Sequence, residues 1–321
     1  MRLMDSIRIK APAHLHTGNP DLSGDMGRLY GTVGFAIETP SLEVEVRKSD
    51  RDRSNDNDAL KFLRRFRESY DFPPVEVTVR RYIPKWVGIG FHTTLALTMG
   101  AAISKLYGLG LSLEDVALAM RRGLITALGF YAVKVGGFIY EGGFPVDRRE
   151  KVVPPLIFRG EMPEDWLFVV AIPETPRKAL TEVRKREDEI LGNLKKMPPE
   201  LADRLSRIVL MKILPAFVER DIRTFGEGLY QFNHLLGEFW SDYQENVYCC
   251  DIVNEGIKLM LERAHCACQT SWGPTFYGLV DGIEHAERLR AEVEAFLREN
   301  GDGGEVFVTK ADNRGMVVLD G

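Results

Sequence analysis

The sequence predicts a fold of the α+β class. Segments with strand period and segments with helix period are mixed in both halves of the chain, and few of them form clean β-α-β units. The clearest local unit is a strand, a loop and a helix: Val75–Arg80 alternates apolar and polar residues, Ile83–Thr94 carries two glycines, and Leu95–Tyr107 is apolar at helical spacing. A chain of 321 residues, 45% of them hydrophobic, can bury a large core, and its length suggests two domains.

The first half, residues 1–160, is expected to form the N-terminal domain. Residues 11–34 contain five glycines and are expected to be mostly loop, and Ser112 with Asp115 forms a capping-box pattern at a helix start. The other predicted elements are strands at 6–10, 35–40, 42–47 and 75–80, helices at 59–70, 95–107 and 112–122, and a hairpin at 135–143. A proline-bearing stretch at 145–165 marks the joint between the domains.

The second half, residues 161–321, begins with an apolar segment, Trp166–Ile172, that predicts a buried strand. Long helical patterns dominate the residues after this strand. The predicted helices span 178–194, 199–219, 221–240, 254–265 and 283–299, and the predicted strands span 275–280, 305–309 and 316–319.

The glycine loop is the first candidate binding element. Gly88 and Gly90 allow a backbone to approach a ligand closely, and the first N–H groups of the following helix favour an anion such as phosphate. The loop is not a Walker A motif, because no Gly-Lys-Ser/Thr follows. A simple turn before a helix remains an equal alternative.

Charge and cysteine content narrow the classes of function. The formal net charge of -5 disfavours a nucleic-acid surface, which needs a basic face. No apolar run is long enough to span a membrane, and the N-terminus lacks the apolar segment of a signal peptide, so we expect a soluble cytoplasmic protein. The four cysteines, Cys249, Cys250, Cys266 and Cys268, lack zinc-ligand spacing and are expected to be reduced thiols rather than a metal site.

The glycine loop resembles that of the GHMP superfamily of small-molecule kinases, Pro-x-x-x-Gly-Leu-Gly-Ser-Ser. Pro84, Gly88 and Gly90 match that motif, whereas Phe91 and His92 stand where the kinases have serines. The resemblance implies a ribosomal-protein-S5-like N-terminal domain and a ferredoxin-like C-terminal domain. It also places Gly129 where the kinases carry a catalytic aspartate.

Further segments resemble one branch of this superfamily, the β-ribofuranosylaminobenzene 5′-phosphate synthases. The matching segments are Leu15-His16, Asp21-Leu22-Ser23-Gly24, Gly27-Arg28, residues 122–129, residues 136–143 and Gln269-Thr270-Ser271-Trp272-Gly273-Pro274, the last being the most specific. They extend over most of the chain. Phe91, His92, Thr126 and Glu141 are departures from the family pattern that leave the acceptor and strict orthology open.

The resemblance implies a phosphoribosyl transfer in methanopterin biosynthesis, an archaeal-type pathway. Phosphoribosyl pyrophosphate condenses with 4-hydroxybenzoate or 4-aminobenzoate, and pyrophosphate and CO2 leave. Mg²⁺ is the expected cofactor, and the partners are these small molecules rather than nucleic acid or membrane. Assembly is left open, with a homodimer as one option.

Within that reaction, Asp21, Arg28 and His16 are the expected catalytic residues. Asp21 is the expected Mg²⁺ ligand, although Asn19-Pro20-Asp21 is also a common turn sequence. Arg28 offers a fork for phosphate, with a surface ion pair to Asp25 as the alternative. For His16, a packed, hydrogen-bonded histidine is an equal alternative.

We expect the catalytic cleft to lie between the two domains, with Asp21 and Arg28 of the first half facing residues 269–274 of the second. The remaining candidates fall into two groups. The expected phosphate-binding residues are Lys85, Gly88, Gly90, His92 and Thr93. The expected residues for the aromatic acid are Gln269, Thr270, Ser271 and Trp272, unless this segment is only a tight turn with a core tryptophan.

Two other functions stay open. One is a GHMP-type kinase with an altered loop, which Phe91 and Gly129 argue against. The other is a non-catalytic protein that binds phosphorylated metabolites, which the retained Asp21, Arg28 and Trp272 argue against.

Overall fold

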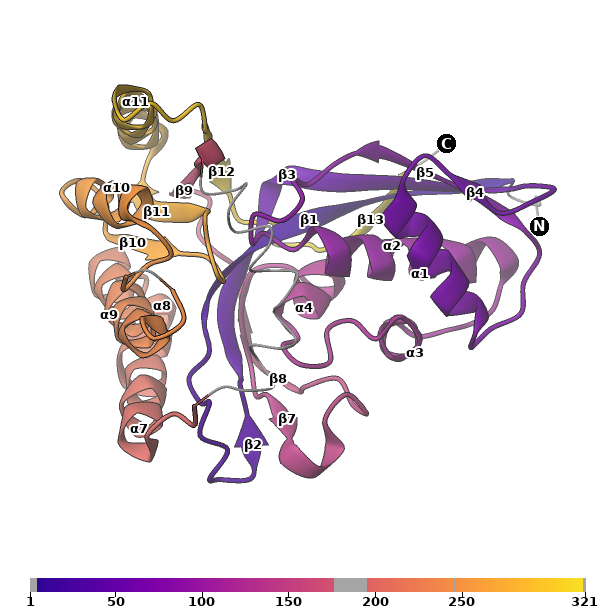
Figure 1. Cartoon of the computed structure of the whole chain (residues 1–321), viewed down its shortest axis with the longest axis horizontal. Helices are drawn as coiled ribbons and strands as arrows, with labels where there is room; N and C mark the ends of the chain where they lie inside the picture. Colours follow the sequence, from indigo (N-terminus) through magenta and orange to yellow (C-terminus); the bar gives the residue numbers. More distant parts are fainter. Residues whose placement is uncertain (1–4, 176–194, 245, 320–321) are drawn as a thin grey trace.

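The computed structural model describes residues 5–175, 195–244 and 246–319, and it confirms the α+β class (Figure 1). Two sheets organise the chain. The larger, seven-stranded sheet has the order β13-β1-β3-β5-β4, with β6 on β3 and β8 on β6. Its strands are β1 (Ser6–Gly18), β3 (Thr32–Lys48), β4 (Arg53–Ser54), β5 (Val75–Arg81), β6 (Phe138–Glu141), β8 (Leu156–Gly160) and β13 (Val317–Leu319).

The second sheet has four strands in the order β10-β11-β9-β12. These are β9 (Trp166–Ile172), β10 (Cys266–Gln269), β11 (Phe276–Asp281) and β12 (Glu305–Lys310), all antiparallel. A separate two-stranded ribbon pairs β2 (Arg28–Leu29) with β7 (Phe144–Pro145). Just after β7, residues 146–148 form η1 (Val146–Arg148).

The antiparallel pair β1 and β3 is longer than the sequence indicated. The prediction of a loop from residue 11 was wrong over 11–18, where β1 continues with alternate residues Ala11, Ala13 and Leu15 fully buried. A register shift after Pro12 keeps the strand paired, since Pro12 faces Ser41 and Ala13 faces Ile37. The proline at position 40 therefore lies in the bulge between these pairs instead of ending the strand.

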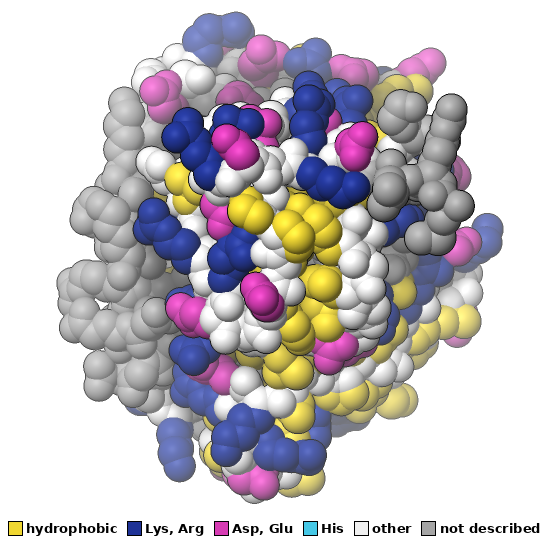
Figure 2. Space-filling model, turned by 90° about the vertical axis from the view of Figure 1, so that its right-hand side faces the viewer, with side chains coloured by type: hydrophobic (Ala, Val, Ile, Leu, Met, Phe, Trp, Pro, Cys, Tyr) yellow, Lys and Arg dark blue, Asp and Glu magenta, His cyan; other side chains and the backbone are white. Residues whose placement is uncertain are grey.

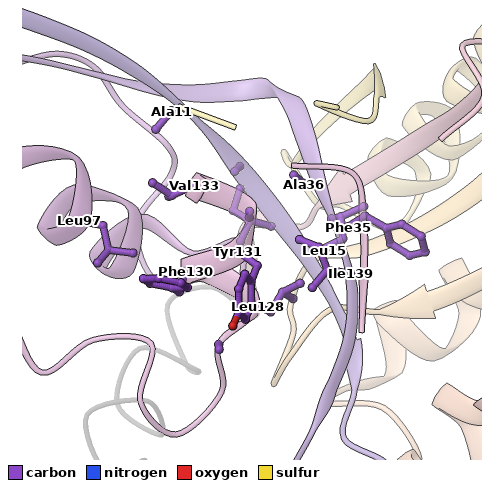
Figure 3. Close-up of a cluster of buried hydrophobic side chains, with 14 of the residues drawn as sticks. Ala11, Leu15, Phe35, Ala36, Leu97, Leu128, Phe130, Tyr131, Val133 and Ile139 are labelled. Atoms are coloured by element: carbon purple, nitrogen blue, oxygen red, sulfur yellow. The ribbon is translucent and has the colours of Figure 1, made fainter. Parts of the chain in front are cut away.

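The helices of the first half are α1 (Asn57–Arg67), α2 (Phe91–Tyr107), α3 (Leu113–Met120) and α4 (Leu128–Lys134). The predicted capping box of α3 is present, with Ser112 and Asp115 each bonded to the other's backbone N–H. The sequence pattern did not predict α4, which has seven residues and contains a glycine. Figure 3 shows its side chains Leu128 and Val133 beside those of β1 and β3, so packing rather than local pattern stabilises this short helix.

The hairpin predicted at 135–143 was wrong. Only 138–141 form a strand, β6, which lies between β3 and β8. The glycines on either side are used for close approach: Gly137 and Gly143 both have positive φ, and a β-carbon at either would lie 2.4 Å or less from a backbone oxygen.

The second half has its helices in the predicted order. They are α7 (Pro199–Ile208), a π-helical turn η2 (Val209–Ile213), α8 (Leu214–Glu219), α9 (Ile222–Trp240), α10 (Asp251–Leu261) and α11 (Ile283–Glu299). The single helix predicted over 199–219 is thus interrupted by a π turn, and the strand β10 was not predicted. The helix predicted over 178–194 lies outside the described residues.

In space, α1 to α3 lie on one side of β1 and β3, and α9 to α11 lie on the other (Figure 1). The chain returns to the first sheet at its end, because β13 pairs antiparallel with β1. The domain division predicted near residue 160 falls after β8 and before β9, the first strand of the second sheet. This division stays a prediction.

One face of the molecule shows Lys and Arg interspersed with Asp and Glu around a hydrophobic strip, without a basic groove (Figure 2). Within the described residues, no helix is both long and apolar enough for a membrane span.

Candidate functional site

A cavity of about 860 Å³ lies where the two halves meet. Such a volume is in the range of small-molecule sites. From the first half come β1, the glycine loop, the start of α2 and the segment after α3. From the second half come α9 and six residues outside it: Gln244, Val247, Tyr248, Gln269, Ser271 and Trp272. The cavity can therefore form only when both halves are folded against each other.

Hydrogen bonds from residues 270–275 fix this junction. The Thr270 hydroxyl accepts from the His16 N–H at 2.8 Å and donates to the Gly88 carbonyl at 3.0 Å. The Ser271 N–H donates to the His16 carbonyl at 3.0 Å, and the Thr275 hydroxyl donates to the Val87 carbonyl at 2.6 Å. The turn that follows β10 is thus bonded to both β1 and the glycine loop, and it sets the width of the cavity.

The first-half side of the cavity is cationic. Four arginines line it: Arg65, Arg121, Arg122 and Arg149. They come from α1, from the end of α3 and from the loop after η1, so three separate segments converge there. Among the described lining residues, Glu150 is the single acid. The N-terminal turn of α2 adds its free N–H groups to the same side, an arrangement that favours a phosphorylated ligand.

Arg122 is hydrogen-bonded to the helix that follows the glycine loop. Its Nη2 donates to the Thr93 hydroxyl at 3.1 Å, in the first turn of α2. Gly90 caps that helix with φ +92, a conformation that favours glycine. The guanidinium fork and the helix N-terminus are therefore held side by side, which suits an oxygen-rich anion.

Three histidines line the cavity and are neutral at pH 7. Burial, with smaller contributions from His16 and Arg122, lowers the pKa of His14 to about 3. Burial also lowers the pKa of His16 to about 4. For His92, burial and then Arg122 lower the pKa to about 4, against the opposing charge of Asp58, whose carboxylate lies 3.6 Å from Nε2. His14 and His16 are two residues apart on β1, so their side chains lie on the same face of the strand, and both line the cavity.

The second-half side is aromatic. The rings of Trp240 and Trp272 lie 4.5 Å apart at a tilt of 58°, and both line the cavity together with Val247 and Tyr248. Trp272 is partly exposed rather than part of a core. Two tilted indoles beside an open space suit a flat ring.

Eight of the predicted residues lie in this one cavity: His16, Gly88, Gly90, His92, Thr93, Gln269, Ser271 and Trp272. Gln269 is held in place at both ends of its amide, because Oε1 accepts from the Cys249 N–H at 2.7 Å and Nε2 donates to the Ser271 carbonyl at 3.1 Å. Its contribution is to shape the turn that carries Trp272.

Asp21 and Arg28 are outside the cavity, contrary to the arrangement expected from the motifs. The Asp21 Oδ1 accepts from the Ser23 N–H and hydroxyl, each at 2.7 Å. Asp21 is thus a turn-forming aspartate, the expected alternative to a Mg²⁺ ligand. Arg28 donates to the carbonyls of Gly142 and Gly143 at 2.9 and 2.7 Å. Its fork thus joins β2 to the turn before β7, and the predicted face-to-face placement with residues 269–274 was wrong.

The side chains of Lys85 and Thr270 are also bonded to other groups of the protein. The Lys85 ammonium pairs with the carboxylates of Asp56 at 2.6 Å and Asp58 at 2.9 Å, and these partners raise its pKa against the opposing effect of burial. Thr270 uses its one hydroxyl proton on the Gly88 carbonyl and is fully buried. Neither side chain lines the cavity, so both have a structural role.

Several lining residues were missed by sequence reasoning. Arg122 begins the matched segment 122–129, but as a short basic pair with Arg121 it fits a solvated face or a local anion contact equally well from sequence. Arg65 lies on the charged face of α1, and Arg149 lies in the expected domain joint, so neither carried a local signal. Trp240 ends a long amphipathic helix, where an aromatic residue usually indicates core.

The departures from the kinase motif have physical consequences. Phe91 is 2% exposed, and the Lys85 ammonium lies 4.5 Å from its ring centroid, so it is a packing residue in place of a hydroxyl. A β-carbon at Gly129 would lie 2.8 Å from His14 Cε1. Glu141 is fully buried, accepts from the Thr32 hydroxyl and from the N–H groups of Gly143 and Ala127, and has its pKa raised to about 7 by burial. Within the described part of the chain, no three His, Cys, Asp or Glu side chains group as metal ligands would.

Comparison with known proteins agrees with this geometry. Residues 213–299 match the family model "GHMP kinases C terminal". The chain is 28% identical to the β-ribofuranosylphenol 5′-phosphate synthase of Archaeoglobus fulgidus over 97% of this chain and 99% of that protein. It is 27% identical to the enzyme of the same name from Methanocaldococcus jannaschii, again over 97% and 99%.

Solved structures share the fold at low identity. The homoserine kinase of Cytophaga hutchinsonii superposes with a TM-score of 0.70 at 16% identity over 99% of both chains. A mevalonate diphosphate decarboxylase from Enterococcus faecalis gives 0.62 at 14% identity, over 98% of this chain and 99% of that one. The GHMP-type fold and the resemblance to the synthases, both expected from the motifs, are confirmed.

Proposed function

We propose that this protein is a phosphoribosyltransferase of the β-ribofuranosylaminobenzene 5′-phosphate synthase type. It would condense phosphoribosyl pyrophosphate with 4-hydroxybenzoate or 4-aminobenzoate and release pyrophosphate and CO2. The observation that carries the proposal is one cavity with a cationic side and an aromatic side. The full-length similarity to synthases whose name gives a ribofuranosylphenol phosphate as product supports it.

The chemistry matches the two sides of the cavity. The C–O bond between ribose C1 and pyrophosphate breaks, and the pyrophosphate leaves with the electron pair. The ring carbon that bears the carboxylate bonds to C1, and the C–COO⁻ bond then breaks so that its electrons restore the aromatic ring. The group lost from the ring carbon is CO2, so no proton has to be removed there. A site with neutral histidines and with glycine at position 129 is compatible with such a reaction.

The arginines supply the catalysis that this reaction needs. Negative charge grows on the departing pyrophosphate, and Arg122 with the N-terminal turn of α2 is placed to stabilise it. The indoles of Trp240 and Trp272 would hold the acceptor ring, with its carboxylate-bearing carbon toward the ribose. The turn at residues 270–275 walls one side of the cavity and would shield that side of a bound donor from water.

In this proposal, Mg²⁺ would be bound by the diphosphate of the donor rather than by side chains of this protein. The donor set does not fit a protein-bound Mg²⁺, which prefers carboxylate oxygens. Among the described lining residues only Glu150 is acidic, and the predicted ligand Asp21 lies outside the cavity with Oδ1 already accepting hydrogen bonds.

A GHMP-type kinase remains the alternative on the grounds of fold. The buried Phe91 removes a hydroxyl from the phosphate loop, and Gly129 removes the base. The expected cytoplasmic location and a homodimer stay predictions.

Calorimetry with Mg²⁺ present tests the proposal. Phosphoribosyl pyrophosphate should bind, and ATP should not bind at comparable concentration. Binding of ATP followed by phosphate transfer to an alcohol would overturn the synthase assignment.

A further inference from the structure

His14 occupies a space that two glycines make available. A β-carbon at Gly90 would lie 1.9 Å from the Cε1 of His14 and 2.3 Å from its Nδ1, so no other residue fits at position 90 while the ring stays in place. A β-carbon at Gly129 would lie 2.8 Å from the same Cε1. The imidazole therefore lies between the glycine loop and α4, at the wall of the cavity.

One nitrogen of this ring has no hydrogen-bond partner among the described residues. This atom, Nδ1, is buried, and the side chain is only 8% exposed. A buried polar atom without a partner costs free energy, and such atoms in a cavity are commonly satisfied by a ligand. Burial keeps the ring neutral at pH 7, so it can accept a hydrogen bond at one nitrogen and donate from the other.

The position of the ring indicates which part of a ligand it meets. On one side, Thr93 lies against the same Gly129 that adjoins His14, and Thr93 accepts from Arg122 at the cationic end. On the other side, His16 is two residues along the same strand and is bonded to Ser271, next to Trp272. His14 thus lies between the side suited to phosphate and the side suited to the aromatic ring.

We propose that His14 binds a hydroxyl group of the donor's ribose ring. This inference rests on the proposed function, which places a ribose between a phosphate group and an aromatic acid. The arginines match the charged groups of the donor, whereas a neutral imidazole with a free nitrogen matches a neutral hydroxyl. The ring would fix the sugar near the carbon that reacts, and it would distinguish ribosyl from deoxyribosyl donors.

Binding of sugar phosphates tests this without any turnover. The dissociation constants of ribose 5-phosphate, 2-deoxyribose 5-phosphate, 3-deoxyribose 5-phosphate and inorganic pyrophosphate are measured for the wild type, His14→Ala and His14→Asn. His265→Ala, a histidine paired with Asp281 outside the cavity, is the control. Loss of the hydroxyl that His14 binds should weaken binding to the wild type about threefold to tenfold, the range of one neutral hydrogen bond.

In the wild type, ribose 5-phosphate should bind more tightly than the deoxy sugar that lacks the hydroxyl bound by His14. In His14→Ala this difference should vanish, while pyrophosphate affinity stays within about twofold of the wild type. His14→Asn, which keeps a donor and an acceptor, should retain part of the preference and serves if the alanine variant does not fold. An equal loss for pyrophosphate would mean that the ring binds phosphate, and unchanged ratios for both deoxy sugars would mean that it only packs. Failure of the wild type to bind any of these ligands would instead refute the proposed function.

Discussion

Replacement of Gly90 by alanine should be among the most damaging single-methyl changes in this protein, and His14 should be the reason. Gly90 has φ +92, and a side chain in the left-handed region costs about 1–2 kcal/mol. The added methyl would also lie 1.9 Å from His14 Cε1, far inside contact distance. Overpacking of this kind costs about 1–3 kcal/mol more. The free energy of unfolding should therefore fall by about 2–5 kcal/mol.

Gly108 provides the matched control at the other end of the same helix. It caps the C-terminus of α2 with φ +64, and a β-carbon there meets nothing within 4 Å. Gly108→Ala should thus show only the backbone cost, about 1–2 kcal/mol. In the double variant His14→Ala/Gly90→Ala the clash is absent, so the coupling energy should be favourable by about 1–3 kcal/mol.

Equilibrium unfolding in urea, followed by tryptophan fluorescence and circular dichroism, measures all four variants. If Gly90→Ala is no less stable than Gly108→Ala, or if the effects of His14→Ala and Gly90→Ala simply add, the imidazole does not fill the space between the glycines. The inference about His14 would then lose its structural basis.

Four further predictions concern the cavity and its surroundings. Arg122→Lys should weaken pyrophosphate binding about tenfold or more, as expected for loss of charge-assisted hydrogen bonds, and an unchanged affinity in calorimetry would remove Arg122 from the phosphate site. Trp272→Ala should raise the KM for the aromatic acid much more than that for the donor; equal effects in steady-state kinetics would argue against an acceptor site there. Because the pKa values of His14 and His16 in the folded protein are about 3 and 4, below the ordinary value of 6.5, the unfolded chain takes up protons first, and stability should be lost as the pH falls from about 6.5 toward 4. In urea titrations at several pH values, His14→Gln should reduce the change in the free energy of unfolding by about 1.4 kcal/mol per pH unit. An unchanged pH dependence would contradict the burial argument. Arg28→Ala should lower the melting temperature without changing donor affinity, since its fork bonds two carbonyls; a large loss of affinity would show that the β2–β7 ribbon reaches the substrate.

The parts of the fold that local sequence determines were predictable. The strand, glycine loop and helix at residues 75–107 depend on alternation, on positive-φ glycines and on a helix N-terminus. All three are present in the predicted order, and the helix begins at Phe91 instead of Leu95. The short α4 escaped prediction because its packing against β1 and β3, rather than its own pattern, stabilises it. The strand β10 escaped prediction because it has only four residues, although it pairs with the next strand, β11.

The candidate site was predictable only in part, for a similar reason. Motif matches found Gly88, Gly90 and Trp272, which line the cavity and whose backbone conformation or bulk follows from the residue type itself. They also suggested Arg28, but whether an arginine is free for a ligand depends on carbonyls more than a hundred residues away in sequence. In the same way, Arg65 and Arg149 become neighbours of the glycine loop only through the folded arrangement.

The most direct test of the central claim is the release of CO2 from carboxyl-labelled acceptor. Purified protein with Mg²⁺, phosphoribosyl pyrophosphate and labelled 4-hydroxybenzoate should release labelled CO2 in a 1:1 ratio with pyrophosphate, and a parallel reaction with labelled 4-aminobenzoate identifies the acceptor. Both products should disappear when the donor is replaced by ATP. Bound donor with no label released from either acid, or phosphate transfer from ATP to an alcohol, would contradict the account.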